Sequence, residues 1–244
     1  KNLIPFLVEI SIDGSTKGVS HVNFGQRPFK YTAPSGFKCI CTRHLDDTFS
    51  GDELNNPSKY FDVKAYVGSG TDNRDIKGVG FQPDLVWIKS RDKDSSYHYL
   101  YDAERGATYA LHPNEIDTEE AETTTLKAFN SDGFRLGTHG NVNETNHDTV
   151  AWMWDGGTDQ DPIEDAYDID PTGQWINDKS GFSITAYTGN GSDDQTLPHG
   201  LGAKPNLVII KNRDNNLGSW IVKHSTLTSG KQLILETNQA ESDS

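Results

Sequence analysis

A long internal repeat constrains this sequence more than any other feature. Residues 78–92 (GVGFQPDLVWIKSRD) return in degenerate form 122 residues later as residues 200–214 (GLGAKPNLVIIKNRD). The stretch upstream agrees, because residues 61–70 return as residues 182–191 at an offset of 121. A register kept over this length indicates two copies of one module, so a single large domain is disfavoured.

The predicted strands lie inside this repeat and alternate with a period of two. Phe61, Val63, Ala65 and Val67 alternate with polar or amphipathic residues, which is typical of a half-buried strand. Residues 85–88 are apolar on both sides and predict a central strand, buried on both faces. Residues 126–136 predict a hairpin, and residues 150–154 a strand whose Val150, Trp152 and Trp154 share one face and are expected in the core.

These strands and the polar stretches between them predict an all-β fold of tandem antiparallel β-sandwiches, jelly-roll or lectin-like, joined by acidic linkers. The expected parts are short strands in residues 1–45, a linker at 46–59, a first sandwich at 60–157, an acidic linker at 158–180 and a second, incomplete sandwich at 181–244. The second copy lacks counterparts of the hairpin and of the Trp-rich strand. We therefore expect either more chain beyond Ser244 or strands donated by a neighbouring subunit, because open sheet edges invite pairing.

Composition excludes several classes of partner. The chain has 36 acidic and 22 basic residues, a formal charge of −14, which disfavours binding to nucleic acid or to an anionic membrane. No run approaches the roughly 18 apolar residues of a membrane span. Cys39 and Cys41 share one face of a predicted strand and are expected to be small core residues rather than a disulfide or a metal site.

The N-terminal part resembles a known family. Residues 22–29 (VNFGQRPF), followed by Tyr31, Pro34, Gly36 and Phe37, resemble the closing segment of a SPRY domain. The resemblance covers about 45 residues. It implies that residues 1–45 are the C-terminal part of a SPRY-like β-sandwich, whose earlier strands would lie upstream of Lys1, and that Phe24 and Phe29 serve packing.

The repeat itself resembles a β-sandwich module of bacteriophage (cyanophage-like) tail-fibre and appendage proteins. The residues that carry this resemblance are 105–108 (RGAT), 129–134 (FNSDGF), 140–143 (GNVN) and 151–157 (AWMWDGG). It covers residues 60–157 well and 181–244 in part. It implies a structural protein on the exterior of a virion, with other virion proteins as partners, and no activity that transfers residue by residue.

A search for catalytic motifs favours a protein that is not an enzyme. The sequence has no Gly-x-Ser-x-Gly elbow, no His-Glu-x-x-His and no complete phosphate loop. Gly68-Ser-Gly70 and Gly189-Asn-Gly191 lack the third glycine of a dinucleotide loop and predict hairpin turns. No cofactor is expected, apart from calcium as the alternative described next.

One segment has the opening of a calcium loop. Asp168, Asp170 and Gly173 match the first, third and sixth positions of an EF-hand loop. Lys179 stands at the twelfth position, where a bidentate acid would close the calcium shell. The main interpretation is a solvated acidic linker, and calcium shared with another segment is the alternative.

Two further groups of residues are candidates for ligand binding. Arg91 and Asp92 end a predicted strand and recur as Arg213 and Asp214, so they either grip an anionic or sugar ligand or pair with each other and fix a turn. Three tyrosines at alternate positions share one face, which is either core or a stacking platform for sugars. They are Tyr97, Tyr99 and Tyr101.

The function predicted from the sequence is structural. We expect a virion protein of a bacteriophage, a tail-fibre component or capsid decoration, that assembles as a homo-oligomer such as a trimer and contacts a host-surface glycan during attachment. The alternative is a carbohydrate-binding module of a larger depolymerase or adhesin.

Overall fold

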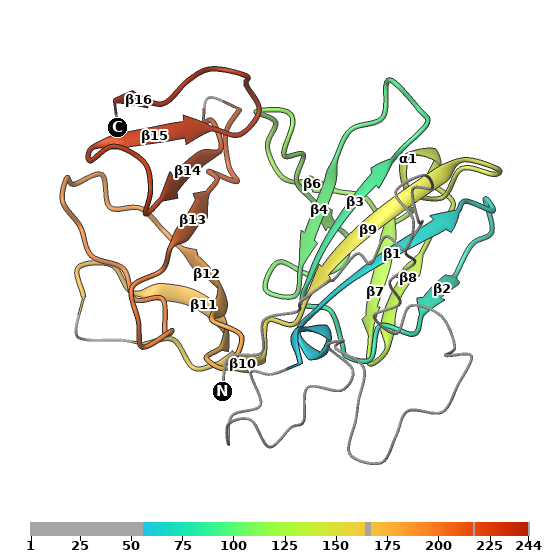
Figure 1. Cartoon of the computed structure of the whole chain (residues 1–244), viewed down its shortest axis with the longest axis horizontal. Helices are drawn as coiled ribbons and strands as arrows, with labels where there is room; N and C mark the ends of the chain where they lie inside the picture. The colour runs from blue at the N-terminus through green and yellow to red at the C-terminus, as the bar shows by residue number, and fades with distance from the viewer. Residues whose placement is uncertain (1–55, 164–166, 217, 244) are drawn as a thin grey trace, which may run out of the picture. The chain divides into compact units, whose positions relative to one another are not determined.

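The computed structural model describes residues 56–163, 167–216 and 218–243. These residues belong to one unit, Asn56–Ser244. The predictions for residues 1–45 and for most of the 46–59 linker lie outside the described residues. The described part consists almost entirely of antiparallel strands (Figure 1), which confirms the all-β prediction. None of its helices has the length and apolarity that crossing a membrane requires.

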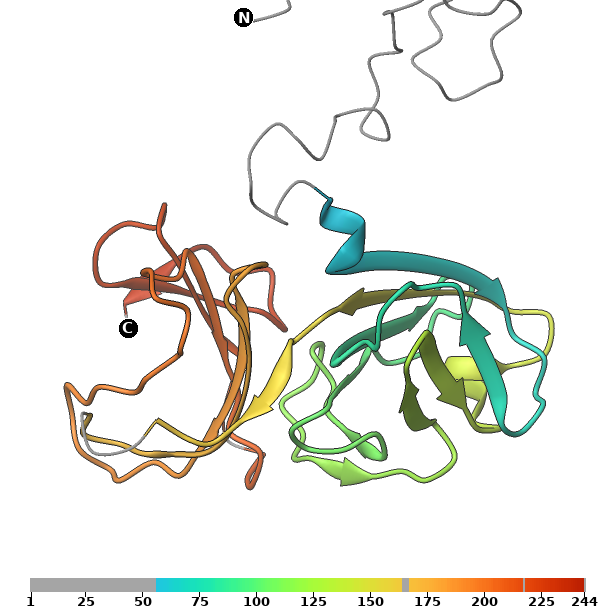
Figure 2. The ribbon, with the colours of Figure 1, turned by 90° about the horizontal axis from the view of Figure 1, so that it is seen from below.

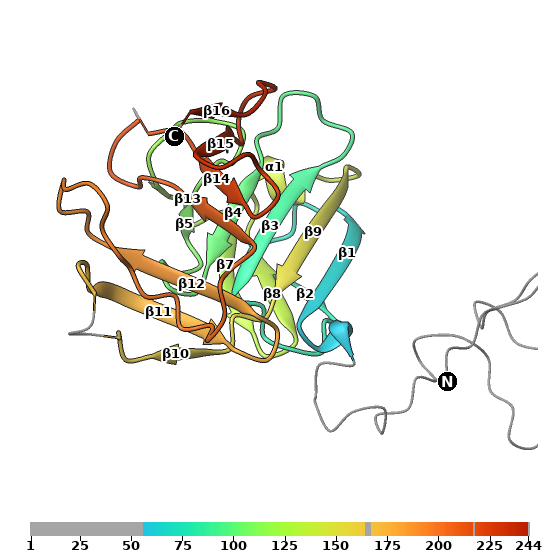
Figure 3. The ribbon, with the colours of Figure 1, turned by 60° about the vertical axis from the view of Figure 1, so that its left-hand side comes forward.

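The first copy of the repeat contains two main antiparallel sheets and the two-stranded sheet β5-β6. The larger has the order β1-β9-β3-β4, which Figure 3 shows side by side, and the smaller has the order β2-β8-β7. The bounds in the larger sheet are β1 (Phe61–Val67), β3 (Leu85–Ser90), β4 (Tyr99–Asp102) and β9 (Asp148–Trp154). In the smaller they are β2 (Arg74–Lys77), β7 (Leu126–Asn130) and β8 (Gly133–Leu136). The remaining elements of this copy are β5 (Tyr109–Ala110), β6 (Glu120–Ala121), the helix α1 (Gly140–Asn143) and the 3-10 helix η3 (Pro57–Lys59).

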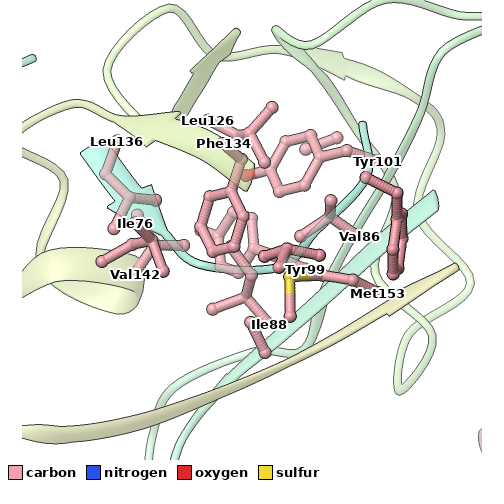
Figure 4. Packing of buried hydrophobic residues seen from close by; sticks show 14 residues of the cluster. Ile76, Val86, Ile88, Tyr99, Tyr101, Leu126, Phe134, Leu136, Val142 and Met153 are labelled. Carbon is pink, nitrogen blue, oxygen red and sulfur yellow. The ribbon is translucent and has the colours of Figure 1, made fainter. Parts of the chain in front are cut away.

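One hydrophobic core lies between these two sheets (Figure 4). The larger sheet contributes Val86 and Ile88, and the smaller contributes Leu126 and Phe134, all with no exposed surface. β3 is central in its sheet, as the run of apolar residues predicts. Because complete burial of such a side chain contributes about 1.5–3 kcal/mol, this core is the main source of stability in the first copy.

The faces of β1 and β9 are the reverse of those expected from the sequence. Phe61 and Val63 on β1 are exposed, and Trp152 on β9 is only half-buried, on the outer side of the sheet. The inner side of β9 carries Ala151 and Met153, both fully buried. The register explains this, because β9 pairs with β3 so that these two residues lie beside the inward residues of β3.

The second copy repeats the pairing of β3 to β6 residue for residue. The equivalent strands are β13 (Leu207–Ile210), β14 (Ile221–His224), β15 (Lys231–Ile234) and β16 (Ser242–Asp243), in that order in one sheet. The equivalent pairs are Leu85–Asp102 and Leu207–His224, Trp87–Leu100 and Ile209–Val222, and Tyr109–Ala121 and Lys231–Asp243. The sequence offset of 122 is therefore also an offset in backbone register.

The predicted linker at residues 158–180 is wrong as a linker, because it contains two strands. β10 (Thr158–Gln160) and β11 (Pro171–Asn177) form a sheet with β12 (Phe182–Tyr187), the first strand of the second copy. The chain passes from β9 into β10 over three residues (Figure 2). Acidic residues flank β11 in the sequence, which is why this segment was predicted as a linker. Within the strand, Gln174 is fully buried, and its side-chain amide donates to the Pro198 carbonyl at 2.9 Å.

The second copy does not form a second closed sandwich within the described residues. The core cluster draws only on the first copy, from Ile76 to Met153. In the second copy, Ile209 and Ile210 stay exposed at 43% and 39%.

The exposure of Val63 on β1 and the burial of Ile88 on β3 predict unequal losses of stability for two alanine substitutions. Ile88→Ala removes a buried side chain and should lower the free energy of unfolding by about 2–5 kcal/mol. Val63→Ala should cost about 0.5 kcal/mol, because the Val63 side chain lies on the exposed face. Urea denaturation of both variants measures this, and a larger loss for Val63→Ala would contradict the assigned faces.

Candidate functional site

The outer face of the larger sheet carries an aromatic cluster with one polar partner. Trp87 on β3 lies beside Trp152 on β9, with ring centroids 6.3 Å apart in an edge arrangement. The indole Nε1 of Trp87 donates to Nδ1 of His98 at 2.9 Å. The backbone N–H of His98 donates to Oδ1 of Asn114 at 2.8 Å. An indole, an imidazole and a carboxamide are thus held in one arrangement.

The hydrogen bond from Trp87 determines the state of His98. Because Nδ1 accepts this bond, the neutral ring carries its proton on Nε2. Burial lowers the pKa of His98 below its usual value, and the charge of Lys89 lowers it further. At neutral pH, His98 is therefore uncharged and has one ring N–H left as a donor.

A groove of about 720 Å³ opens beside this cluster. One wall comes from the first copy and the other from the end of the second. Its lining residues are Trp87, His98, Pro113, Asn114, Leu235, Glu236, Thr237, Asn238 and Gln239. The groove therefore combines an aromatic ring with carboxamide, hydroxyl and carboxylate groups, a mixture that suits a polar organic ligand.

The loop before β6 is held by side chains of the second copy, which keeps the groove in place. Trp220 is 3% exposed, and its Nε1 donates to the carbonyls of His112 and Glu115 at 3.1 and 3.0 Å. Arg213 binds the Glu119 carboxylate through two nitrogens, at 3.0 and 2.8 Å. A buried indole with two acceptors and a bidentate guanidinium are specific anchors.

Glu119 joins two arginines from different copies of the repeat. Besides Arg213, it accepts a hydrogen bond from Arg105, whose side chain is 4% exposed and also pairs with Asp102. Burial raises the pKa of Glu119, but the hydrogen bonds from both arginines outweigh this and hold the pKa below its ordinary value. Glu119 therefore stays ionised and links the copies.

Arg91 and Asp92 serve the local fold in this structure. The Asp92 carboxylate accepts the backbone N–H of Asp148 at 3.1 Å and lies 3.1 Å from Nδ1 of His147, and these bonds lower its pKa. Arg91 does not pair with Asp92 but lies 3.9 Å from the Asp148 carboxylate. Asp92 is thus engaged with the chain's own groups, whereas the Arg91 side chain is 57% exposed and, among the described residues, makes only this long ion pair. Neither residue lines the groove.

The three tyrosines do not form one platform. Tyr99 and Tyr101 belong to the core, with 2% and 0% exposure, on the inner side of β4. Tyr97 precedes β4 and is 43% exposed. Tyr99 and Tyr101 are therefore core residues, and their burial prevents them from stacking on a sugar.

Asp168 and Asp170 are not brought together with other ligands in the described part of the chain. Oδ2 of Asp168 accepts both the backbone N–H and the hydroxyl of Thr196, at 2.9 and 2.6 Å, which lowers its pKa. Among the described residues, no three His, Cys, Asp or Glu side chains come together as a metal site. The Asp168 carboxylate instead fixes the chain to the loop after β12.

Sequence reasoning missed His98 and Asn114, although the repeat held a signal for them. An offset of 122 aligns His98 with Trp220 and Asn114 with Glu236. The contact is kept, because the backbone N–H of Trp220 donates to Oε2 of Glu236 at 3.1 Å as His98 does to Asn114. Alignment of the two copies beyond residue 92 would have shown that these positions are equivalent, but not that they are hydrogen-bonded.

Comparison with known proteins identifies one family. A family described as a domain of unknown function (DUF7483) matches residues 56–244. No curated protein and no solved structure matches the chain.

The state of His98 predicts a loss of stability in mild acid. Its folded pKa lies below the unfolded value of about 6.5, so the stability that depends on the neutral ring is present above that pH and is lost as the pH falls. Chemical denaturation between pH 7.5 and 5 should therefore show a steeper decline for the wild type than for His98→Gln. Parallel curves for the two proteins would mean that His98 titrates alike in folded and unfolded chains.

Proposed function

We propose that this chain, which belongs to the DUF7483 family, is a non-catalytic structural module that binds a carbohydrate in the groove beside Trp87. The single observation that carries this proposal is the composition of the groove. Sugar rings present C–H faces that pack on aromatic rings, and hydroxyls that need both donors and acceptors. Trp87 supplies a ring, and Asn238 and Gln239 supply side-chain amides that both donate and accept.

The absence of catalytic motifs in the sequence supports a binding role rather than a reaction. The groove also lies where the two copies meet, so it depends on their association and not on one loop. A site of this kind suits attachment, in which a surface is held in place rather than converted.

The wider role that we propose is that of a bacteriophage virion protein, a tail-fibre component or capsid decoration on the exterior of the particle. This step is supported by the resemblance of residues 60–157 alone. Other virion proteins and further copies of the chain are the partners that this role implies. The second candidate is a carbohydrate-binding module of a larger depolymerase or adhesin, which the same groove favours.

The proposal predicts glycan binding that depends on Trp87. On a glycan array the wild-type chain should bind a sugar, and Trp87→Ala should weaken that binding by about tenfold or more, the factor for 1.4 kcal/mol. Tyr109→Ala is the matched control, because Tyr109 is an exposed aromatic residue on β5 outside the groove, at 42% exposure.

Two outcomes would contradict this function: no glycan bound at all, or equal affinity for wild type and Trp87→Ala while both keep the same melting temperature. Assays of particles separate the two wider roles. Incorporation of the chain into virions supports the structural role, and binding of free sugar without incorporation supports the carbohydrate-binding module.

A further inference from the structure

The groove beside Trp87 contains equivalent segments of both copies. The first copy contributes Pro113 and Asn114, and the second contributes residues 235–239, which begin at the same point of the repeat, 122 residues later. Asn114 of the first copy is equivalent to Glu236 of the second. The second copy therefore has a carboxylate where the first has a carboxamide.

Among the described residues that line the groove, Glu236 is the one that carries a charge at neutral pH. The other lining side chains are aromatic, apolar, hydroxyl or carboxamide groups, and the ring of His98 is uncharged while its Nδ1 accepts from Trp87. Neither lysine nor arginine is among them. The groove thus presents one negative charge and no cation that could receive an acidic group of a ligand.

Two lysines lie near the groove, but their ammonium groups bind backbone carbonyls. The charge of Lys89 lowers the pKa of His98, and Nζ of Lys89 donates to the carbonyl of the next residue at 2.7 Å. Nζ of Lys211 donates to the Ile116 carbonyl at 3.2 Å and to that of the residue after Lys211 at 2.7 Å. Neither lysine lines the groove, so neither replaces the missing cation.

The carboxylate of Glu236 is held by the contact that joins the two copies. Its Oε2 accepts the backbone N–H of Trp220 at 3.1 Å. Trp220 is 3% exposed, and its indole is fixed by two carbonyls of the first copy. Glu236 is half-buried, and salt screens a partly buried charge less than an exposed one. The negative charge therefore acts on whatever enters the groove.

The remaining polar groups of the groove suit hydroxyls. Within the described part of the chain, the side-chain amides of Asn238 and Gln239 make no hydrogen bond, so each can donate to a ligand and accept from it. Nε2 of His98 carries a proton and is a further donor. Uncharged donors and acceptors pair with the hydroxyls of a sugar without burying an unpaired charge.

We propose that the groove selects glycans that carry no acidic group and that Glu236 is the residue that determines this specificity. The inference rests on the proposed function, because it names the class of glycan that the groove beside Trp87 takes. Uncharged hexoses and N-acetylated amino sugars belong to this class. Sialic acids, uronic acids and phosphorylated sugars do not.

An acidic sugar meets two unfavourable terms in this groove. Its anionic group loses water, and the lining residues offer no cation to compensate for that loss. The anionic group also approaches the carboxylate of Glu236, and like charges at short distance repel each other. An uncharged sugar meets neither term, because its hydroxyls donate to the carboxylate and exchange hydrogen bonds with the amides. The specificity thus arises from rejection of the acidic competitor.

The test compares matched sugars on one array with the whole chain. The array carries oligomers of glucose, galactose and mannose, each beside the oligomer of the corresponding uronic acid and the methyl ester of that acid. In every set that the chain binds, the uronic acid oligomer should bind about tenfold more weakly than the hexose oligomer. The methyl ester should recover the affinity, because it removes the charge of the ligand without any change in the protein.

A pair of variants tests the role of Glu236. Glu236→Gln removes the charge and keeps an oxygen that accepts the Trp220 N–H. In this variant the ratio of the two affinities, hexose over uronic acid, should fall by about fivefold, because two like charges about 4 Å apart repel by that factor even in water. Asp193→Asn is the matched control, since it removes the same charge from an exposed residue outside the groove, and it should keep the wild-type ratio.

Two results would overturn this inference and leave the proposed function standing. One is binding of hexose and uronic acid oligomers with equal affinity, both lost in Trp87→Ala. The other is an unchanged ratio in Glu236→Gln at an unchanged melting temperature, because the rejection would then come from another group. A chain that binds no sugar in any set would overturn the inference and the proposed function together.

Discussion

The backbone pairing of β9 with two strands at once is the constraint on which the first copy depends. β9 follows β3 by more than 50 residues in the chain, yet it inserts between β1 and β3 with seven pairs on one side and six on the other. This insertion determines which face of each strand meets the core, because a shift of one residue would reverse every side chain. The buried pair Ala151 and Met153 and the outer pair Trp152 and Trp154 are consequences of that register.

In the described part of the second copy, no strand takes the equivalent position. β13 to β16 still pair in the register of β3 to β6, because all their partners lie within the copy. The counterpart of β2, residues 196–199, is not a strand.

The association of the two copies creates the groove. It also buries two side chains of the second copy. Trp220, at the position of His98 in the repeat, becomes buried against the loop before β6, and Val222 is 8% exposed. Lys211 and Arg213 are identical in type to Lys89 and Arg91 but make different contacts. Lys211 donates to the Ile116 carbonyl, and Arg213 binds Glu119. Copies of one module have thus acquired different contacts at equivalent positions.

The sequence predicts the repeat, the hairpin of β7 and β8, the central place of β3 and the all-β class, because each depends on local alternation or on an offset visible in the chain. It does not predict which phase of β9 faces inward, because both phases carry apolar residues and the pairing with β3 decides. In β1 the alternation itself misleads, because the apolar phase with Phe61 and Val63 is the exposed one. β11 was missed because acidic residues flank Trp175 and Ile176. The groove was missed because Trp87 and Gln239 meet only after both copies have folded.

The two copies share one register, and no strand in the described residues takes the place of β9 beside β13. Residue-resolved hydrogen exchange of the free chain tests it most directly. In β3, the amides of Val86 and Trp87 should both be protected, whereas in β13 Val208 should be protected and Ile209 should exchange rapidly. Equal protection of Val208 and Ile209 would contradict the account, because it would mean that a strand already covers this edge.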